Sequence, residues 1–311
     1  MTDSLLTKYR PRDFAEMIGH EDVIASVNAS LEKQQRVFLF SGAPGLGKTS
    51  FARAIASELE ITEHNIIEMD AGKVSGVDAM RELTDLISSQ PLGGGNRMII
   101  INECQGLSTQ AWNSLLVNLE EPAAYNFWCL TTTLISKVPV AAKQRCAAFQ
   151  LKPVRGDLIL SLLDEIVELE KIVLPAGVVD LCVTEANGSP RDALAHMVAC
   201  LGVKSLGAAE EILSAASSQA EAFQLAQVLV QKKPWPVVRE LLLKMPDARA
   251  ESIRHVVLNY VSKVAMSDKA YPTDAMTIIA CFMEPMDEGL GQAPILHAVS
   301  RLFAARIKEV F

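Results

Sequence analysis

The sequence predicts an α/β domain with a parallel five-stranded sheet, followed by a small helical domain and a separate all-helical domain. In the first half of the chain, short and continuously apolar runs alternate with longer amphipathic stretches. A parallel sheet covered by helices on both faces requires this alternation. A glycine-rich loop joins the first apolar run to a helical pattern, and the strand pattern stops after residue 152. The remainder of the chain is therefore expected to be helical.

The apolar runs define five strands within residues 1–152. These are Val37–Phe40, Ile66–Asp70, Met98–Asn102, Phe127–Thr132 and Ala148–Leu151. Helical patterns between the strands include Thr49–Leu59, Val77–Ser88 and Thr109–Leu119. Trp112 and Trp128 are expected in the core of this domain rather than on its surface.

Three helical patterns follow residue 152. They are Asp157–Ile172, Pro175–Glu185 and Pro190–Leu201. The first places its apolar residues on one helical face. A hinge is expected from Gly202 to Gly207, and prolines divide the last section into four to six helices. The predicted domains are 1–152, 153–205 and 206–311.

Composition limits the class of protein. Of 311 residues, 50% are hydrophobic and 21% are charged, which is typical of a folded chain with more than one core. The formal net charge of −8 argues against whole-chain attraction to a polyanion. Any contact with nucleic acid would need a local basic patch or helix N-termini that face phosphates.

The same composition predicts a cytoplasmic protein that does not enter a membrane. No apolar run is long enough to cross a bilayer, and residues 1–4 lack a basic segment followed by an apolar one. Six cysteines are scattered without a C-x-x-C pair. They are expected to be reduced thiols, not disulfides or zinc ligands.

The loop after the first strand matches the pattern G-x-x-x-x-G-K-[ST]. It consists of Gly42, Ala43, Pro44, Gly45, Leu46, Gly47, Lys48 and Thr49, with Ser50 following. Glycines let successive backbone N–H groups point at phosphate oxygens, and the helix N-terminus adds partial positive charge. We expect Lys48 to reach the β- and γ-phosphates and the Thr49 hydroxyl to bind Mg²⁺. The alternative is an unrelated glycine-rich turn before a helix.

Two polar residues end the third strand, where a parallel sheet presents ligand-binding groups. Glu103 can orient and deprotonate an attacking water. Asn102 stands where a second carboxylate would hold the metal shell, and its neutral amide should attract Mg²⁺ less strongly. We therefore expect Asn102→Asp to raise Mg²⁺ affinity. Both residues could instead simply end the strand.

Several stretches together resemble the clamp-loader branch of the AAA+ ATPases, which includes replication factor C small subunits, the bacterial gamma/tau subunit and the phage large subunit. They are T-K-Y-R-P-R-D-F at 7–14, I-G-H-E at 18–21, the segment 66–81, L-L-V-N-L-E-E-P at 115–122, K-Q-R-C at 143–146 and G-S-P-R-D-A-L at 188–194. The resemblance spans residues 5–200. It implies an AAA+ domain, a helical lid and a C-terminal collar that mediates oligomerisation, with ATP and Mg²⁺ as ligands.

The resemblance also implies roles for single residues. Tyr9, Arg10, Pro11 and Ile18 would surround the adenine. Arg145 would act as an arginine finger in the nucleotide site of a neighbouring subunit, although Gln144 replaces the usual serine. Arg191 would detect the γ-phosphate from the first turn of a helix that Ser189 caps. Thr133, with Thr132 as second choice, would be the polar sensor at the end of the fourth strand. Without the resemblance to this family, Arg145 and Arg191 would be interpreted as solvated surface residues.

Relatives bind the template-strand backbone near helix N-termini, which here correspond to Lys73, Ser75, Gly76, Ser108 and Thr109. Such groups bind phosphates without reading bases. Other clamp-loader subunits, in an assembly of five, would be partners that pack against the apolar C-terminal section. A sliding clamp would bind the face formed by 79–90 and 107–118.

The expected function is that of an ATPase subunit of a sliding-clamp loader. ATP binding would open the clamp, and hydrolysis on primer–template DNA would release it. This places the protein in the cytoplasm, at the nucleoid or replication fork, or within an infected host cell. One alternative is a weakly hydrolysing or stator subunit that donates an arginine, which Asn102 favours. Another is an AAA+ motor such as a Holliday-junction helicase, which K-Y-R-P and L-E-E-P argue against.

Overall fold

The computed structural model describes residues 5–71, 77–245, 250–266, 272–286 and 292–308. The chain forms two compact units, Met1–Leu206 and Gly207–Phe311. The further division of the first unit near residue 152 stays a prediction. Among the helices of the described segments, none is both long and apolar enough to cross a membrane.

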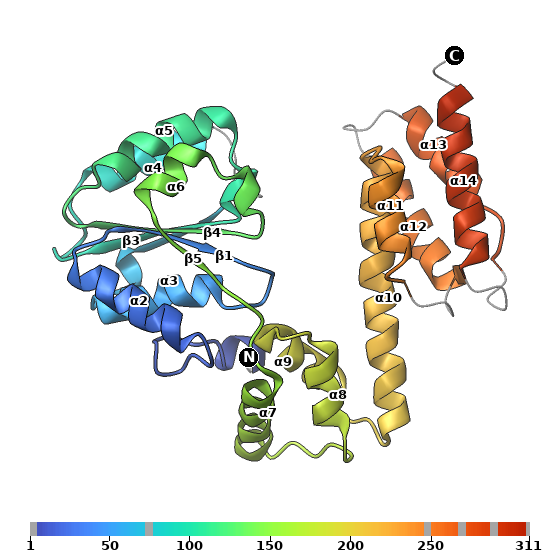
Figure 1. The fold of residues 1–311 in the computed structure, drawn as a ribbon, viewed down its shortest axis with the longest axis horizontal. Coiled ribbons are helices and arrows are strands. Elements are labelled where there is room, and N and C mark those ends of the chain that lie inside the picture. Colours follow the sequence, from blue (N-terminus) through green and yellow to red (C-terminus); the bar gives the residue numbers. More distant parts are fainter. Residues whose placement is uncertain (1–4, 72–76, 246–249, 267–271, 287–291, 309–311) are drawn as a thin grey trace. The chain divides into compact units, whose positions relative to one another are not determined.

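The first unit is built on the predicted parallel sheet of five strands (Figure 1). The strands are β1 (Val37–Ser41), β2 (Ile66–Asp70), β3 (Arg97–Asn102), β4 (Asn126–Thr132) and β5 (Ala147–Gln150). Their order in the sheet is β2-β3-β4-β1-β5, and every pair is parallel. Strand bounds differ from the sequence prediction by at most one residue. The chain leaves β1 and β4 in opposite directions across the sheet, so the loop after β1 lies at a switch point where such folds bind ligands.

Helices cover both faces of this sheet. On one face lie α2 (Glu21–Glu32) and α3 (Lys48–Glu58), and on the other α4 (Val77–Ser88), α5 (Thr109–Glu120) and α6 (Val140–Arg145) (Figure 1). Side chains alternate between the faces along each strand. Phe40 stacks on Phe51 of α3 with ring centroids 5.0 Å apart, whereas Leu39 packs in the cluster that contains Trp112 of α5. Trp112 and Trp128 are buried, which confirms the prediction that they are core residues.

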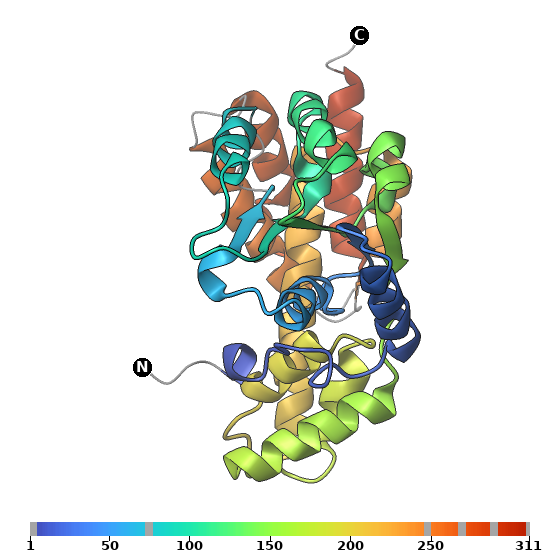
Figure 2. The ribbon, with the colours of Figure 1, turned by 90° about the vertical axis from the view of Figure 1, so that its left-hand side faces the viewer.

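The remaining elements of the first unit are short turns and a group of three helices. The turns are α1 (Leu5–Lys8), η1 (Glu63–Asn65), η2 (Cys104–Gly106) and η3 (Ile135–Lys137). The group consists of α7 (Gly156–Glu170), α8 (Val178–Glu185) and α9 (Pro190–Ala199), which lie together beyond α2 and α3 (Figure 1, Figure 2). The predicted start of the second helix at Pro175 is wrong. Gly177 has a φ of +83°, which is left-handed, so the helix begins only at Val178.

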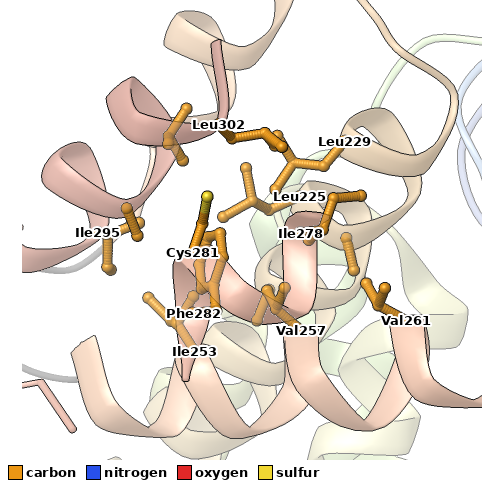
Figure 3. Packing of buried hydrophobic residues seen from close by; sticks show 14 of the residues in the cluster. Leu225, Leu229, Ile253, Val257, Val261, Ile278, Cys281, Phe282, Ile295 and Leu302 are labelled. Atoms are coloured by element: carbon orange, nitrogen blue, oxygen red, sulfur yellow. The ribbon is translucent and has the colours of Figure 1, made fainter. Parts of the chain in front are cut away.

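The second unit is helical, as predicted. Its described residues form α10 (Leu206–Val230), α11 (Trp235–Leu242), α12 (Ala250–Ala265), α13 (Pro272–Phe282) and α14 (Ala293–Lys308). Leu225, Val257, Phe282 and Leu302 come from four of these helices and meet in one buried core (Figure 3). The helix α10 begins at Leu206, inside the predicted hinge, and Gly207 lies in its first turn.

Candidate nucleotide-binding site

A cleft of about 520 Å³ opens at the carboxyl ends of the strands in the first unit. Most residues predicted to bind the cofactor line it. These are Tyr9, Arg10, Pro11, Ile18, Pro44, Gly45, Leu46, Gly47, Lys48, Thr49, Ser50 and Arg191. Asn102, Glu103 and Thr131 also line the cleft. The fold thus brings together segments that are as much as 180 residues apart in the sequence.

The phosphate-loop pattern folds into a tight loop between β1 and α3. Gly45 and Gly47 have φ values of +76° and +89°, which only glycine adopts readily. The backbone N–H of Gly42 donates to the carbonyl oxygen of Thr132 at 3.2 Å, which ties the loop to β4. A side chain at Gly42 would place its Cβ 2.7 Å from the carbonyl oxygen of Leu151. The loop therefore requires glycine at these positions.

The Lys48 ammonium lies inside this loop. Its Nζ donates to the carbonyl oxygens of Gly42 at 2.9 Å and Ala43 at 2.8 Å. Gly42 and Ala43 do not line the cleft, but their carbonyl oxygens hold the Lys48 ammonium at its edge. Burial lowers the pKa of Lys48, and the charge of Glu103 acts in the opposite direction. A buried cation whose hydrogen-bond partners are neutral carbonyls favours an incoming polyanion.

The two predicted metal ligands are in contact. The Thr49 hydroxyl donates to Oδ1 of Asn102 at 2.8 Å, and the Thr131 hydroxyl donates to the same oxygen at 3.0 Å. The amide nitrogen of Asn102 donates to Oε1 of Glu68, on β2, at 2.8 Å. A hydroxyl and an amide oxygen this close, with a carboxylate beside them, form the hard oxygen donor set that suits Mg²⁺. The residues present therefore fit this ion.

Glu103 is held by the residues that follow β3 and β4. It has a left-handed backbone with a φ of +50°, which turns it away from the line of β3. The Thr133 hydroxyl donates to its Oε2 at 3.0 Å, and the amide nitrogen of Gln105 donates to the same oxygen. Thr132 instead donates to Oε1 of Gln105 at 2.6 Å. Thr133 is thus outside the lining of the cleft but contacts Glu103 directly, which favours it over Thr132 as the sensor.

Arg145 lies apart from this cleft, at the end of α6. Its Nη2 forms an ion pair with Oε2 of Glu120 at 3.0 Å, and its Nη1 donates to the carbonyl oxygen of Ala141 at 2.9 Å. Glu120 is the last residue of α5 and the first glutamate of L-E-E-P. The structure therefore holds the guanidinium in place without bringing it to the nucleotide site of its own chain.

The first turn of α9 closes one side of the cleft. The Ser189 hydroxyl caps the helix by accepting a hydrogen bond from the backbone N–H of Asp192 at 3.2 Å, as the sequence predicts. Arg191 and Arg10 both line the cleft. Burial lowers the pKa of Arg10; Glu68 opposes this, while the charges of Arg53 and Arg191 add to it. Several cations thus face one cleft, as binding of a polyphosphate requires.

The residues predicted to contact DNA are only partly described. Ser108 and Thr109 are exposed at the N-terminus of α5, where the Ser108 hydroxyl accepts a hydrogen bond from the N–H of Ala111 at 3.2 Å. Lys73, Ser75 and Gly76 lie outside the described residues. The six cysteines are free, and all except Cys146 are buried.

Two polar residues at the site were missed by the sequence interpretation. Glu68 is a charged residue in the otherwise apolar strand before Asp70, and that exception was a usable signal. Gln105 follows Glu103 by two residues, but nothing local indicates that its side chain turns back to bind Glu103. Both depend on contacts between neighbouring strands and loops.

Comparison with known proteins finds similarity to clamp-loader subunits. The family model described as DNA polymerase III, delta subunit matches residues 57–155. DNA polymerase III subunit tau of Escherichia coli (strain K12) is 33% identical over 213 residues, which cover 61% of this chain and 33% of the relative. The replication factor C small subunit of Methanococcus maripaludis is 30% identical over 192 residues, or 60% of this chain and 61% of the relative. The chain is thus similar to clamp-loader subunits over about three fifths of its own length. The recognition made from the sequence motifs is thereby confirmed.

Solved structures confirm the fold. The RuvB Holliday junction branch migration motor of Thermotoga maritima has a TM-score of 0.55 over 72% of this chain and 80% of that chain. Its sequence identity is 18%, so the likeness concerns the AAA+ fold and not the activity. The chain spans about a third to three fifths of the length of the curated relatives it matches.

Proposed function

We propose that this protein is an ATP-hydrolysing subunit of a sliding-clamp loader in DNA replication. The observation that supports this most is that the proposed catalytic residues lie in two separate places in the structure. Lys48, Glu103 and Arg191 converge on one cleft, or on its edge, while Arg145 is held elsewhere by Glu120. In such an arrangement, the arginine that completes the ATP site comes from a neighbouring subunit. ATP hydrolysis then takes place only in the assembled complex, as the cycle of a clamp loader requires.

The described residues supply the parts that ATP hydrolysis needs. Lys48 would exchange its two carbonyl partners for the β- and γ-phosphates, and Arg191 would contact the γ-phosphate from α9. Thr49 and Asn102 would hold Mg²⁺, which when bound neutralises charge on the phosphate oxygens. Glu103 would orient and deprotonate the attacking water after it leaves Thr133 and Gln105. Tyr9, Arg10, Pro11 and Ile18 would surround the adenine.

The partners in this proposal are other loader subunits in an assembly of five, a ring-shaped clamp and primer–template DNA. Arg145 would enter the site of the adjacent subunit, where a guanidinium accelerates phosphoryl transfer by roughly 10³-fold or more. Ser108 and Thr109 would present a helix N-terminus to the DNA backbone, and Lys73, Ser75 and Gly76, which lie outside the described residues, stay proposed DNA contacts. Hydrolysis on DNA would then end the clamp-bound state. The site of action would be the replication fork in the cytoplasm.

A second candidate is a stator subunit that binds ATP but hydrolyses it slowly while donating Arg145. The specific observation behind it is the neutral amide of Asn102 beside Thr49. A stator would bind ATP and show no turnover that clamp and DNA stimulate. Strand unwinding by this protein alone, without a clamp, would instead favour the helicase alternative.

The test is the ATPase rate with and without primed DNA and candidate clamps, for the wild type, Lys48→Ala and Arg145→Ala. We expect either variant alone to lose stimulated turnover, by roughly 10³-fold for Arg145→Ala. Mixing the two variants should restore part of it, because an Arg145 from one copy then meets an intact Lys48 in another. Nucleotide binding by Arg145→Ala should stay at the wild-type level.

Arg155→Ala is the matched control, because Arg155 forms an exposed ion pair with Asp157 and its side chain is 78% exposed. It should leave stimulated turnover intact. If a uniform Arg145→Ala assembly is also fully active, the arginine finger is assigned wrongly. A lone protomer with full activity would refute the whole scheme.

A further inference from the structure

Glu68 lies behind the metal ligand Asn102, on the neighbouring strand. Its Oε1 accepts a hydrogen bond from Nδ2 of Asn102 at 2.8 Å. Its Oε2 accepts from Nη2 of Arg53 at 2.7 Å and from Nε of Arg53 at 3.2 Å. Glu68 also lines the cleft. One carboxylate thus links the amide of the metal site to a cation on α3.

This contact determines which end of the Asn102 amide faces Thr49. The hydroxyls of Thr49 and Thr131 can donate or accept, so they would tolerate either orientation of the amide. An ionised carboxylate can only accept, and therefore Glu68 requires the NH₂ end. Oδ1 is then directed at Thr49. Only that oxygen can ligate a metal ion, because the NH₂ group has no free electron pair to offer.

Glu68 also supplies charge. An amide at position 102 leaves the site without the carboxylate that would attract a dication. The Glu68 carboxylate sits one hydrogen bond away from that amide, and it polarises the carbonyl oxygen at the other end. Ligands that are supported in this way by a second residue bind metal more tightly.

We propose that Glu68 is a positioning residue for the Mg²⁺ site, fixing the orientation of the Asn102 amide and providing the negative charge that the amide lacks. This inference rests on the proposed nucleotide site.

The experiment is a Mg²⁺ titration of the binding of a fluorescent ATP analogue, which needs no turnover. Glu68→Ala should weaken the Mg²⁺ midpoint by about 10–100-fold. Glu68→Gln keeps an acceptor but loses the charge, so its midpoint should fall between those of the wild type and Glu68→Ala. Without Mg²⁺, binding of the analogue should not be weaker in either variant than in the wild type, because Glu68 is an anion in the lining of a cleft that takes a polyphosphate.

Glu63→Gln is the matched control. Glu63 also pairs with Arg53, its Oε1 lying 3.2 Å from Nη1 of Arg53, but its bonds do not include Asn102 among the contacts described. This variant should leave the Mg²⁺ midpoint unchanged. Circular dichroism of Glu68→Gln and Glu68→Ala shows whether each variant is folded.

A folded Glu68→Gln or Glu68→Ala whose Mg²⁺ midpoint matches that of Glu63→Gln would overturn the inference. In that case the analogue still binds and the proposed function stands. A wild-type protein that does not bind the analogue at all would overturn the proposed function and this inference together.

Discussion

A methyl group added at Gly45 would test how closely the phosphate loop packs against α9. In Gly45→Ala the new Cβ would lie 2.0 Å from the Ser189 hydroxyl oxygen and 3.2 Å from its Cβ. The hydroxyl would have to move, and it would then lose its capping bond to the N–H of Asp192. The loop and the helix that carries Arg191 would be pushed apart.

The cost has two parts. An alanine in the left-handed conformation of Gly45 costs roughly 1–2 kcal/mol. Loss of a serine cap costs about 1 kcal/mol. The free energy of unfolding of Gly45→Ala should therefore fall by about 2–3 kcal/mol in total, and binding of ATP should weaken because Arg191 moves with α9.

The assay is urea unfolding followed by circular dichroism, with Gly94→Ala as the control. Gly94 has a similar φ of +80°, but an added Cβ would have nothing within 4 Å. Gly94→Ala should therefore show the backbone cost alone. Adding Ser189→Ala to Gly45→Ala should cost less than the sum of the two single changes, because the clashing oxygen is gone. Equal losses for Gly45→Ala and Gly94→Ala would refute this account of the contact.

Two further predictions concern a polar contact in each unit. Gln105→Ala removes a hydrogen bond that holds Glu103 away from its role as a base. A hydrogen bond to a charged group contributes about 1.5 kcal/mol, so steady-state phosphate release without DNA should rise by up to roughly 10-fold. An unchanged basal rate would show that Gln105 does not restrain Glu103. In the second unit, hydrogen bonds from Arg254 and from the N–H of Met286 lower the pKa of Glu251 from 4.5 to about 2. Because the folded-state pKa is the lower one, this stabilisation is present above pH 4.5 and is lost as the pH falls toward 2. Glu251→Gln should remove about 1–2 kcal/mol of it after solvent screening. Urea unfolding between pH 2 and 6 measures this, and parallel pH profiles for wild type and variant would contradict it.

Local patterns account for the part of the fold that was predicted. The five strands were placed within one residue. β1, β3 and β4 are buried on both faces and therefore form almost continuous apolar runs. The loop from Gly42 to Thr49 was also predicted, because its glycines and its lysine form a pattern within eight consecutive residues. The hydrophobic pattern was less informative where a single backbone angle decides where a helix begins. At Gly177 the positive φ delays the start of α8 to Val178, three residues after the predicted start.

The sequence by itself determined the strands, the phosphate loop and the residues able to bind a nucleotide. Only the tertiary structure decided which side chains meet: Glu68 with Asn102, Gln105 with Glu103, and Arg145 with Glu120. Glu68 and Asn102 lie on neighbouring strands, and Arg145 and Glu120 lie on different helices, so their contacts follow from strand register and helix packing. Gln105 and Glu103 are close in the sequence, but they meet because the left-handed backbone of Glu103 turns the chain there. Neither kind of contact leaves a pattern that the sequence alone reveals.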